Sequence, residues 1–139
     1  MQIRNFIYPD DYQHVLTLWE NSGPGVHIHK SDGPEEIQKK LKRDPDLFLV
    51  ATEESKIIGS VIGGYDGRRG MVYHLAVKEQ FRNKGVGKSL MKEIELRLKA
   101  KGCIRCYLLV TQDNVKTIDF YKAMGWDVMK VNPMAKDIE

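Results

Sequence analysis

The stretch that decides the fold is VYHLAVKEQFRNKGVGKSLM, residues 72–91. It begins with an apolar run typical of a buried strand, and from residue 86 onward its apolar residues recur at a spacing that predicts a helix. Between them lies QFRNKGVGKSL, residues 80–90, in which two phosphate-binding patterns overlap. The letters GKS (87–89) match the end of a P-loop, whereas RNKGVG (82–87) matches a different anion-binding turn. Other features of the sequence distinguish between these two interpretations.

The P-loop interpretation fails on spacing. A P-loop requires G-x-x-x-x-G-K-[ST], and Arg82 stands where the first glycine is needed. No apolar strand that ends in an aspartate follows, because Asp113 lies beyond the end of the apolar run at Val110. A dinucleotide pattern G-x-G-x-x-G also fails, since Leu90 occupies the place of its last glycine. The sequence therefore argues against a nucleoside triphosphatase.

The pattern R-x-x-G-x-G between a strand and a helix predicts a pyrophosphate site. Gly85 and Gly87 let the backbone approach an anion closely. The N–H groups of a first helical turn have no partner within the helix, and the helix dipole favours negative charge there. Lys84 and Lys88 add positive charge nearby. The structural alternative is a glycine-rich helix start with a solvated basic edge, and the stretch alone does not say whose pyrophosphate is bound.

Composition favours one globular domain over residues 1–139. The chain is 42% hydrophobic and 29% charged, which suits a packed core with a polar surface. No apolar run approaches the length that spans a bilayer, and the start of the chain has no signal-peptide pattern. The net charge of +3 comes from interspersed charges of both signs. We therefore expect a cytoplasmic protein with no nucleic-acid partner and no membrane association.

Two cysteines, Cys103 and Cys106, form a C-x-x-C pattern. A redox pair needs its first thiol at a helix N-terminus, whereas this pair begins a strand-like run. A zinc site needs two further ligands. His27 and His29 could supply them in principle, but nothing in the sequence links the two segments. We expect no metal and two reduced cysteines, at least one of them in the core.

Hydrophobic periodicity predicts an α/β protein of the α+β type with a mixed sheet. Expected strands span residues 2–8, 47–52, 57–65, 71–77, 103–110 and 126–131, with a short final one in the tail. Expected helices begin at 9–11 and at Pro34 and span 85–101 and 114–123. Strands in hairpin succession favour a mixed sheet, and the unit 71–110 is a right-handed βαβ crossover.

Three segments resemble the GCN5-related N-acetyltransferases (GNAT), in order and spacing, and together they span most of the chain. The first is residues 72–91, which is similar to the acetyl-CoA motif of the family. The second, CYLLVTQDN, ends in Asn114, which matches a cofactor-contacting asparagine. The third, residues 114–126, resembles N-x-x-A-x-x-F-Y-x-x-x-G-F, with Thr117 for alanine and Trp126 for phenylalanine. The stretch GGYDGRRG and the short length further resemble small bacterial members, the YpeA-like proteins.

The resemblance implies a GNAT fold, with a central twisted mixed sheet of six to seven strands, about four helices, and splayed fourth and fifth strands. The pantetheine arm of acetyl-CoA would enter the gap between these strands, and its thioester carbonyl would meet the backbone N–H near Val77. The residues implied in binding acetyl-CoA (coenzyme A) are Leu75, Ala76, Val77, Arg82, Asn83, Lys84, Gly85, Val86, Gly87, Lys88, Ser89, Asn114 and Tyr121.

The resemblance also implies a catalytic role for Tyr121, which would protonate the leaving thiolate or donate a hydrogen bond to it. A phenol with a pKa of about 10 is a feasible acid toward a thiolate. The alternative is a core tyrosine beside Phe120. Asn114 has a competing role as the N-cap of the helix that follows it.

The sequence assigns no general base. An ammonium group has no lone pair, so the acceptor amine must lose a proton before it attacks. Relatives place Glu or His on the strand that corresponds to 71–77, where residues 71, 73, 75 and 77 share one face by the period of two. Met71 and Tyr73 occupy the relevant positions, and neither is a carboxylate. His74 is predicted to face the other way, packed under the long helix, so we expect deprotonation through water.

The expected function is transfer of an acetyl group from acetyl-CoA to a primary amine by direct attack in a ternary complex. The acceptor is a small molecule or a peptide, contacted by residues on the first helix, the following loop and the fourth strand: Trp19, His27, His29 and Tyr73. For His27 and His29 the alternative is that they are ordinary exposed loop residues. A non-catalytic acyl-CoA-binding module is the alternative function. A homodimer is expected only by analogy with the family.

Overall fold

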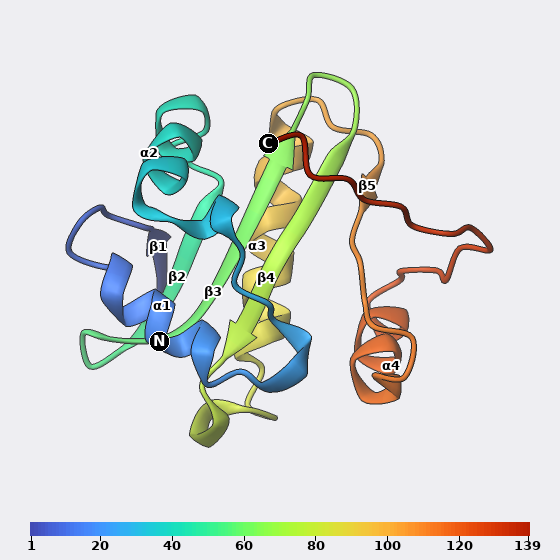
Figure 1. Cartoon of the computed structure of the whole chain (residues 1–139). Helices are drawn as coiled ribbons and strands as arrows, with labels where there is room; N and C mark the ends of the chain where they lie inside the picture. Colours follow the sequence, from blue (N-terminus) through green and yellow to red (C-terminus); the bar gives the residue numbers. More distant parts are fainter. The chain divides into compact units, whose positions relative to one another are not determined.

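The computed structural model describes residues 1–139, which form two compact units, Met1–Leu108 and Leu109–Glu139 (Figure 1). The first unit contains a five-stranded sheet and three α-helices, and the second contains one α-helix. The helices are α1 Tyr12–Glu20, α2 Pro34–Arg43, α3 Val86–Ala100 and α4 Val115–Ala123. All four were predicted from the sequence, with their ends within a few residues. None of them is long and apolar enough to cross a lipid bilayer.

The sheet is mixed, as predicted. Its strands lie in chain order: β1 Gln2–Asn5, β2 Phe48–Glu53, β3 Lys56–Tyr65, β4 Gly70–Val77 and β5 Cys106–Tyr107. The pairs β1–β2, β2–β3 and β3–β4 are antiparallel, and β4–β5 is parallel. The antiparallel neighbours β2, β3 and β4 follow from the short turns between them, whereas the parallel pair needs the crossover through α3.

The expected number of six to seven strands is too high. The strand predicted over 103–110 is reduced to Cys106–Tyr107, because β5 pairs with β4 only at the first two residues of β4. The segment predicted as a strand over 126–131, and the tail after it, form no strand at all. An alternating apolar pattern becomes a strand only where a neighbouring strand accepts its backbone hydrogen bonds, and residues 126–131 form no such ladder.

The helices of the first unit cover both faces of the sheet (Figure 1). Helix α3 packs so closely on β3 that a Cβ atom added at Gly59 would lie 2.9 Å from Leu90. On the opposite face, α1 contacts the same strand through Trp19, whose Nε1 donates a hydrogen bond to the buried Ser60 Oγ at 3.0 Å. The alternation of side chains along β3 therefore sends Gly59 to one helix and Ser60 to the other.

The core on the α1 face is built from aromatic stacking. The rings of Phe6 and Phe48 lie 4.1 Å apart, and the Trp19 ring is nearly parallel to Phe48 at 6.0 Å. Ile62 and Ala76 belong to the same buried cluster and come from β3 and β4. Burial of such rings contributes strongly to stability, so this cluster is a major part of the hydrophobic core.

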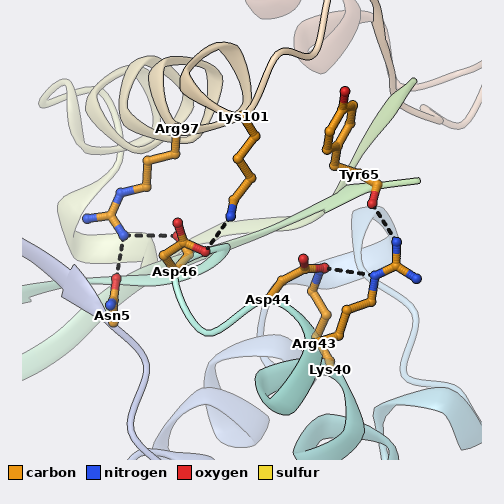
Figure 2. A network of polar contacts seen from close by, with 8 residues as sticks. All are labelled: Asn5, Lys40, Arg43, Asp44, Asp46, Tyr65, Arg97 and Lys101. Carbon is orange, nitrogen blue, oxygen red and sulfur yellow. Dashed lines mark hydrogen bonds and ion pairs between the residues drawn. The ribbon is translucent and has the colours of Figure 1, made fainter. Parts of the chain in front are cut away.

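Polar contacts hold α3 to the edge of the sheet (Figure 2). Arg97 donates from Nη1 to the backbone oxygen of Asp46 at 2.9 Å and to Oδ1 of Asn5. Lys101, the C-cap residue directly after α3, forms an ion pair with the Asp46 carboxylate at 3.1 Å. These contacts join the C-terminal half of α3 to β1 and to the residues before β2, which holds the helix in position along its axis.

A second set of contacts, also in Figure 2, holds the end of α2. Lys40 Nζ lies 2.7 Å from Asp44 Oδ2, and Arg43 lies within ion-pair distance of the same carboxylate. Arg43 also donates from Nη2 to the backbone oxygen of Tyr65 at 2.8 Å. The last turn of α2 is therefore attached to the last residue of β3.

A β-bulge interrupts β4 and changes which residues share a face. Ser60 pairs with Ala76 and Ile62 with Tyr73, so two residues, His74 and Leu75, stand opposite a single residue of β3. His74 has φ +49°, which is uncommon for a residue with a side chain. The expectation that residues 71, 73, 75 and 77 share one face is therefore wrong. Tyr73 is on the α1 face, whereas Val77 pairs with Gly59, on the α3 face.

Candidate active site

The start of α3 leaves backbone donors free in an open position. Gly85 is its N-cap with φ +84°, and a Cβ atom added there would meet nothing within 4 Å. The first intrahelical bond runs from Ser89 N to Gly85 O at 3.0 Å. The N–H groups of residues 86–88 therefore have no partner within the helix. An anion can approach this turn because glycine adds no side chain and the helix dipole is positive here.

Basic side chains surround this turn. Arg82 and Lys84 are exposed, as is Lys88 in the first turn of α3. Lys84 Nζ lies 5.6 Å from the centre of the Phe81 ring, within the range of a cation–π interaction. Asn83 has φ +61°, a left-handed conformation that turns the loop toward the helix. Charge and free N–H groups thus coincide at one end of α3.

The edge of β4 beyond Met71 is open. Strand β5 pairs only with Gly70 and Met71, which gives the splayed pair that was predicted. Lys78 N donates to Ile58 O, so Val77, one residue before, directs its own N–H and C=O away from β3. Arg82 Nε donates to this Val77 carbonyl at 3.0 Å. An extended ligand could hydrogen-bond to this edge as an added strand does.

His74 faces the opposite side from the one predicted. The bulge turns its ring toward α1 and the short turn Lys30–Asp32, where Nε2 lies 2.9 Å from Asp32 Oδ2. The Trp19 ring packs against the imidazole edge-on, with ring centres 4.7 Å apart. The prediction that His74 packs under the long helix is therefore wrong, because it assumed an unbroken period of two along β4.

Asp32 is buried and accepts three hydrogen bonds. Its Oδ2 accepts hydrogen bonds from His74 and from the His29 backbone N–H at 3.0 Å, and its backbone oxygen accepts one from the Tyr12 hydroxyl at 2.9 Å. Burial raises the pKa of Asp32, but the hydrogen bonds from His74 and His29 outweigh it and lower the pKa below its usual value. No pattern in the sequence joins Asp32 to His74, because the pairing depends on how a loop folds over β4.

A separate cavity of about 470 Å³ lies where the end of α2 meets the sheet, and neither His74 nor Asp32 lines it. It is lined by the end of α2, the ends of β3 and β4, and β5, with Lys40, Arg43, Arg69, Met71, Tyr73 and Tyr107 among the lining residues. The Arg69 Nη1 donates to the Tyr107 hydroxyl at 2.7 Å. The cavity is large enough for a small polar molecule.

The residues predicted to contact an acceptor have different surroundings. Tyr73 is 45% exposed and lines the cavity. His27 and His29 are exposed in the loop after α1, with ring centres 6.3 Å apart. Trp19 is 1% exposed and packs behind His74. The structure thus brings Tyr73 to a cavity, and it places Trp19 in the core.

The second unit contains Asn114 and Tyr121, the two predicted site residues that come after β5 in the sequence. The Asn114 side chain accepts a hydrogen bond from Thr117 N at 3.4 Å, which gives it the N-cap role considered from the sequence. Tyr121 is 9% exposed, with the rings of Phe120 and Trp126 at 5.1 Å and 6.0 Å. Burial raises the pKa of Tyr121 to about 12, so its phenol is protonated at neutral pH.

The cysteines are free thiols, and both are half-buried, so the expectation that at least one lies in the core is wrong. Burial raises the pKa of Cys106 to about 11, which leaves that thiol protonated and a poor nucleophile. No three side chains of His, Cys, Asp or Glu come together in a way that could hold a metal ion.

Comparison with known proteins places this chain in a family. Residues 11–126 match the model of the acetyltransferase (GNAT) family. An acetyltransferase of Pectobacterium atrosepticum is 39% identical over 137 residues, covering 98% of this chain and 94% of that protein. The crystal structure of Ard1 from Thermoplasma volcanium has a TM-score of 0.80 at 26% identity, covering 92% of this chain and 83% of that one.

One further structure is similar in fold. The PaiA N-acetyltransferase from Thermoplasma acidophilum, solved in complex with coenzyme A, has a TM-score of 0.78 at 21% identity. The similarity covers 95% of this chain and 94% of that one. At this level of identity the similarity shows a shared fold. In this chain the fold contains the five-stranded mixed sheet with splayed β4 and β5 that is described above.

Proposed function

Because the chain belongs to the acetyltransferase (GNAT) family and is an N-acetyltransferase that uses acetyl-CoA, we propose that it acetylates a primary amine by direct attack in a ternary complex. The observation that carries the proposal is the open edge of β4 ending at the free N–H groups of α3. One long ligand with a pyrophosphate at one end and an extended amide arm would match both features.

The residues of the loop and helix start are proposed to bind the cofactor. Gly85, Val86, Gly87 and the positive charges around them would bind the pyrophosphate through N–H groups and ion pairs. This group of residues is Arg82, Asn83, Lys84, Gly85, Val86, Gly87, Lys88 and Ser89. Leu75, Ala76 and Val77 would provide the backbone along which the pantetheine arm lies. The absence of a side chain at Gly85 supports this assignment, since a larger residue would project into the anion's space.

Val77 is proposed to donate its N–H to the thioester carbonyl. That N–H points away from β3, and the carbonyl of the same residue is already bonded to Arg82. A donor aimed at the oxygen on which negative charge develops stabilises the tetrahedral intermediate, and removal of one such donor costs about 3–4 kcal/mol in other acyl-transfer enzymes.

Tyr121 is proposed as the acid that protonates the departing thiolate. The support is chemical: a phenol whose pKa is about 12 is protonated at every physiological pH and can donate to an anion formed beside it. Asn114 is proposed to contact the cofactor with the part of its side chain that does not cap α4. Both roles follow from the resemblance of residues 114–126 to the family motif.

The acceptor is proposed to enter the cavity that Tyr73 lines. This cavity adjoins the half of β4 before the bulge, while the cofactor edge begins after it. His27 and His29 would lie at the rim of the acceptor path as exposed loop residues, and Trp19 would act only as the wall behind His74. A cytoplasmic location and a homodimer stay predictions from the sequence.

Two measurements test the proposal. The melting temperature of the protein should rise with acetyl-CoA and stay unchanged with Mg-ATP. Release of free coenzyme A thiol should then be followed with a panel of amines: a peptide α-amine, lysine, spermidine and kanamycin. Stabilisation by ATP alone would contradict the cofactor assignment. Binding of acetyl-CoA without thiol release for any amine would favour the non-catalytic acyl-CoA-binding module.

A further inference from the structure

We propose that the acceptor carries a carboxylate set apart from its reacting amine, and that Arg69 binds this carboxylate in the cavity that Tyr73 lines. The inference rests on the proposed entry of the acceptor into that cavity, and it names the chemical class of the acceptor. Three observations carry it: the cations that line the cavity, the carboxylates there that already have partners, and a guanidinium group without a carboxylate partner.

The charged groups of the cavity are unequally paired. Five charged side chains line it, three cationic and two anionic: Lys40, Arg43, Arg69, Asp44 and Asp66. Asp44 Oδ2 lies 2.7 Å from Lys40 Nζ and 3.6 Å from Arg43 Nε. Asp66 Oδ1 accepts hydrogen bonds from the backbone N–H groups of Arg68 and Arg69 at 2.7 Å and 2.8 Å. Both carboxylates therefore have donors of their own, and the Arg69 guanidinium is left without a counter-ion.

The Arg69 guanidinium is held in place by one of its nitrogens and has free donors on another edge. Its Nη1 donates to the Tyr107 hydroxyl at 2.7 Å, and its central carbon lies 5.5 Å from the centre of the Tyr107 ring. Nε and Nη2, which form one edge of the planar group, have no partner in the protein. Two parallel N–H groups on one edge match the two oxygens of a carboxylate.

A second guanidinium group adds positive charge at the same phenol. Arg105 Nε donates to the Tyr107 hydroxyl at 3.1 Å, and its central carbon lies 5.3 Å from the centre of that ring. The Tyr107 oxygen thus accepts hydrogen bonds from two cations, and its own hydrogen is free to donate to an anion. Arg105 does not line the cavity, but Tyr107 does. The start of β5 therefore places two cations without carboxylate partners, and one hydroxyl donor, at this side of the cavity.

The rest of the cavity suits an aliphatic chain. A Cβ atom added at Gly64 would lie 3.7 Å from Tyr73 Cε2 and 3.9 Å from Lys40 Nζ, so glycine leaves space between the ring and the ammonium group. Met71 and Tyr73 add apolar surface. A polyamine would bring its ammonium groups against the three cations, and like charges placed together oppose binding. Cations beside apolar surface therefore favour an acceptor with a carboxylate at the end of a chain.

The carboxylate must be remote from the amine. Tyr73 lines the cavity, and Val77 is the proposed donor to the thioester, four residues further along β4. Four residues of an extended strand span about 13 Å, and the bulge in β4 shortens this path. An α-amino acid cannot reach both points, because its amine and its carboxylate share one carbon. A peptide with an acidic side chain about three residues after the reacting amine reaches both.

Matched acceptors test the class. We expect kcat/KM for the amidated peptide Ala-Ala-Ala-Glu-Ala to exceed that for the same peptide with glutamine or lysine in fourth place by about tenfold, since hydrogen bonds to charged groups are among the stronger ones. The same glutamate in second place should give a smaller advantage. Octylamine and 8-aminooctanoate form the corresponding small-molecule pair. Because Arg69 is exposed, added salt should reduce each advantage.

Variants of the enzyme test the residue. Arg69→Gln should bring the ratio of kcat/KM between the glutamate and glutamine peptides close to one, and Arg69→Glu should reverse the preference toward the lysine peptide. Tyr107→Phe keeps the ring and removes the hydroxyl, so it should lower the ratio in part. Arg68→Gln is the matched control, because Arg68 is an exposed residue of the same turn that does not line the cavity. A general loss of stability affects both peptides equally and leaves the ratio unchanged.

The outcomes are distinguishable. Equal kcat/KM within both acceptor pairs would overturn the anion site, and so would a fall in the ratio for Arg68→Gln as large as that for Arg69→Gln. A preference confined to 8-aminooctanoate would support the site and assign it to a small acid.

Nuclear magnetic resonance tests the site without catalysis. The Arg69 Nε–H signal of the wild type should shift when the N-acetylated glutamate peptide is added, and it should not shift with the glutamine peptide. If no amine is acetylated, the proposed function fails, whereas a shift would still support the anion site. An unshifted signal would overturn the site even in an active enzyme.

Discussion

Arg82 donates its Nε–H to the carbonyl oxygen of Val77 at 3.0 Å, and so joins the loop before α3 to the last residue of β4. This bond uses one of the five guanidinium hydrogens and leaves both Nη groups free for an anion. It also occupies the Val77 carbonyl oxygen, a backbone acceptor that points away from β3. Arg82 therefore both shapes the edge of the sheet and adds charge beside the helix start.

Arg82→Gln should weaken acetyl-CoA binding about tenfold or more, because a hydrogen bond to a charged group contributes about 1.5–3 kcal/mol and this side chain is exposed. Calorimetry with acetyl-CoA measures the Kd. Lys99→Gln, which removes an exposed charge at the far end of α3, is the control and should change little. Equal affinities for Arg82→Gln and the wild type would remove Arg82 from the cofactor site.

Gly85→Ala should weaken acetyl-CoA binding and lower stability by about 1 kcal/mol, since alanine is strained at φ +84°. Gly102→Ala is the matched control, because Gly102 has a similar φ of +98° at the other end of α3. The two variants should melt at similar temperatures, but only Gly85→Ala should bind acetyl-CoA less tightly. A similar loss of affinity in both would show that strain alone weakens binding.

Tyr121→Phe should lower kcat by roughly 10²-fold, the smaller effect expected for loss of a general acid, with little change in the KM for acetyl-CoA. Burial raises the pKa of Tyr121 to about 12, so the phenol stays protonated and the wild type should show no loss of Tyr121 function at alkaline pH below that value. Initial rates of thiol release over a pH series test both statements. A Tyr121→Phe enzyme with wild-type kcat would exclude the acid role.

Asp11 should make stability depend on pH at the acidic end. Burial raises the pKa of Asp11, but the paired hydrogen bonds from Arg4 at 2.6 Å and 3.0 Å, and one from the Ile7 N–H, lower it below its usual value. The folded state thus binds fewer protons than the unfolded state. This stability is present above about pH 4, the unfolded pKa of an aspartate, and is lost as the pH falls through the lower folded pKa.

Asp11→Ala should therefore lower the free energy of unfolding by about 1–3 kcal/mol at pH 7, because it leaves Arg4 and the Ile7 N–H without their acceptor. The difference from the wild type should shrink at pH 3. Urea unfolding at the two pH values measures it, with Asp10→Ala, an exposed neighbour, as control. An equal difference at both pH values would contradict the assigned cause.

Features that depend on local geometry were predictable. The helix α3 and the turn before it follow from the spacing of Gly85, Val86 and Leu90, and the hairpin β2–β3 follows from a short turn between apolar runs. Features that depend on a distant partner were not. The second strand of the splayed pair shrank to Cys106–Tyr107 because it pairs with β4 at two residues only, and the apolar residues around Val128 formed no strand.

The sequence by itself determined the turn that we propose binds an anion, since a glycine at φ +84° followed by free helical N–H groups involves only neighbouring residues. Only the tertiary structure decided the direction of His74. A bulge in β4, set by its pairing with β3, reversed the face that the alternation predicted, and the loop after α1 then placed the buried Asp32 carboxylate against the ring. One inserted residue reverses the faces of a strand, and no local pattern records it, because the bulge is held by contacts between segments far apart in the chain.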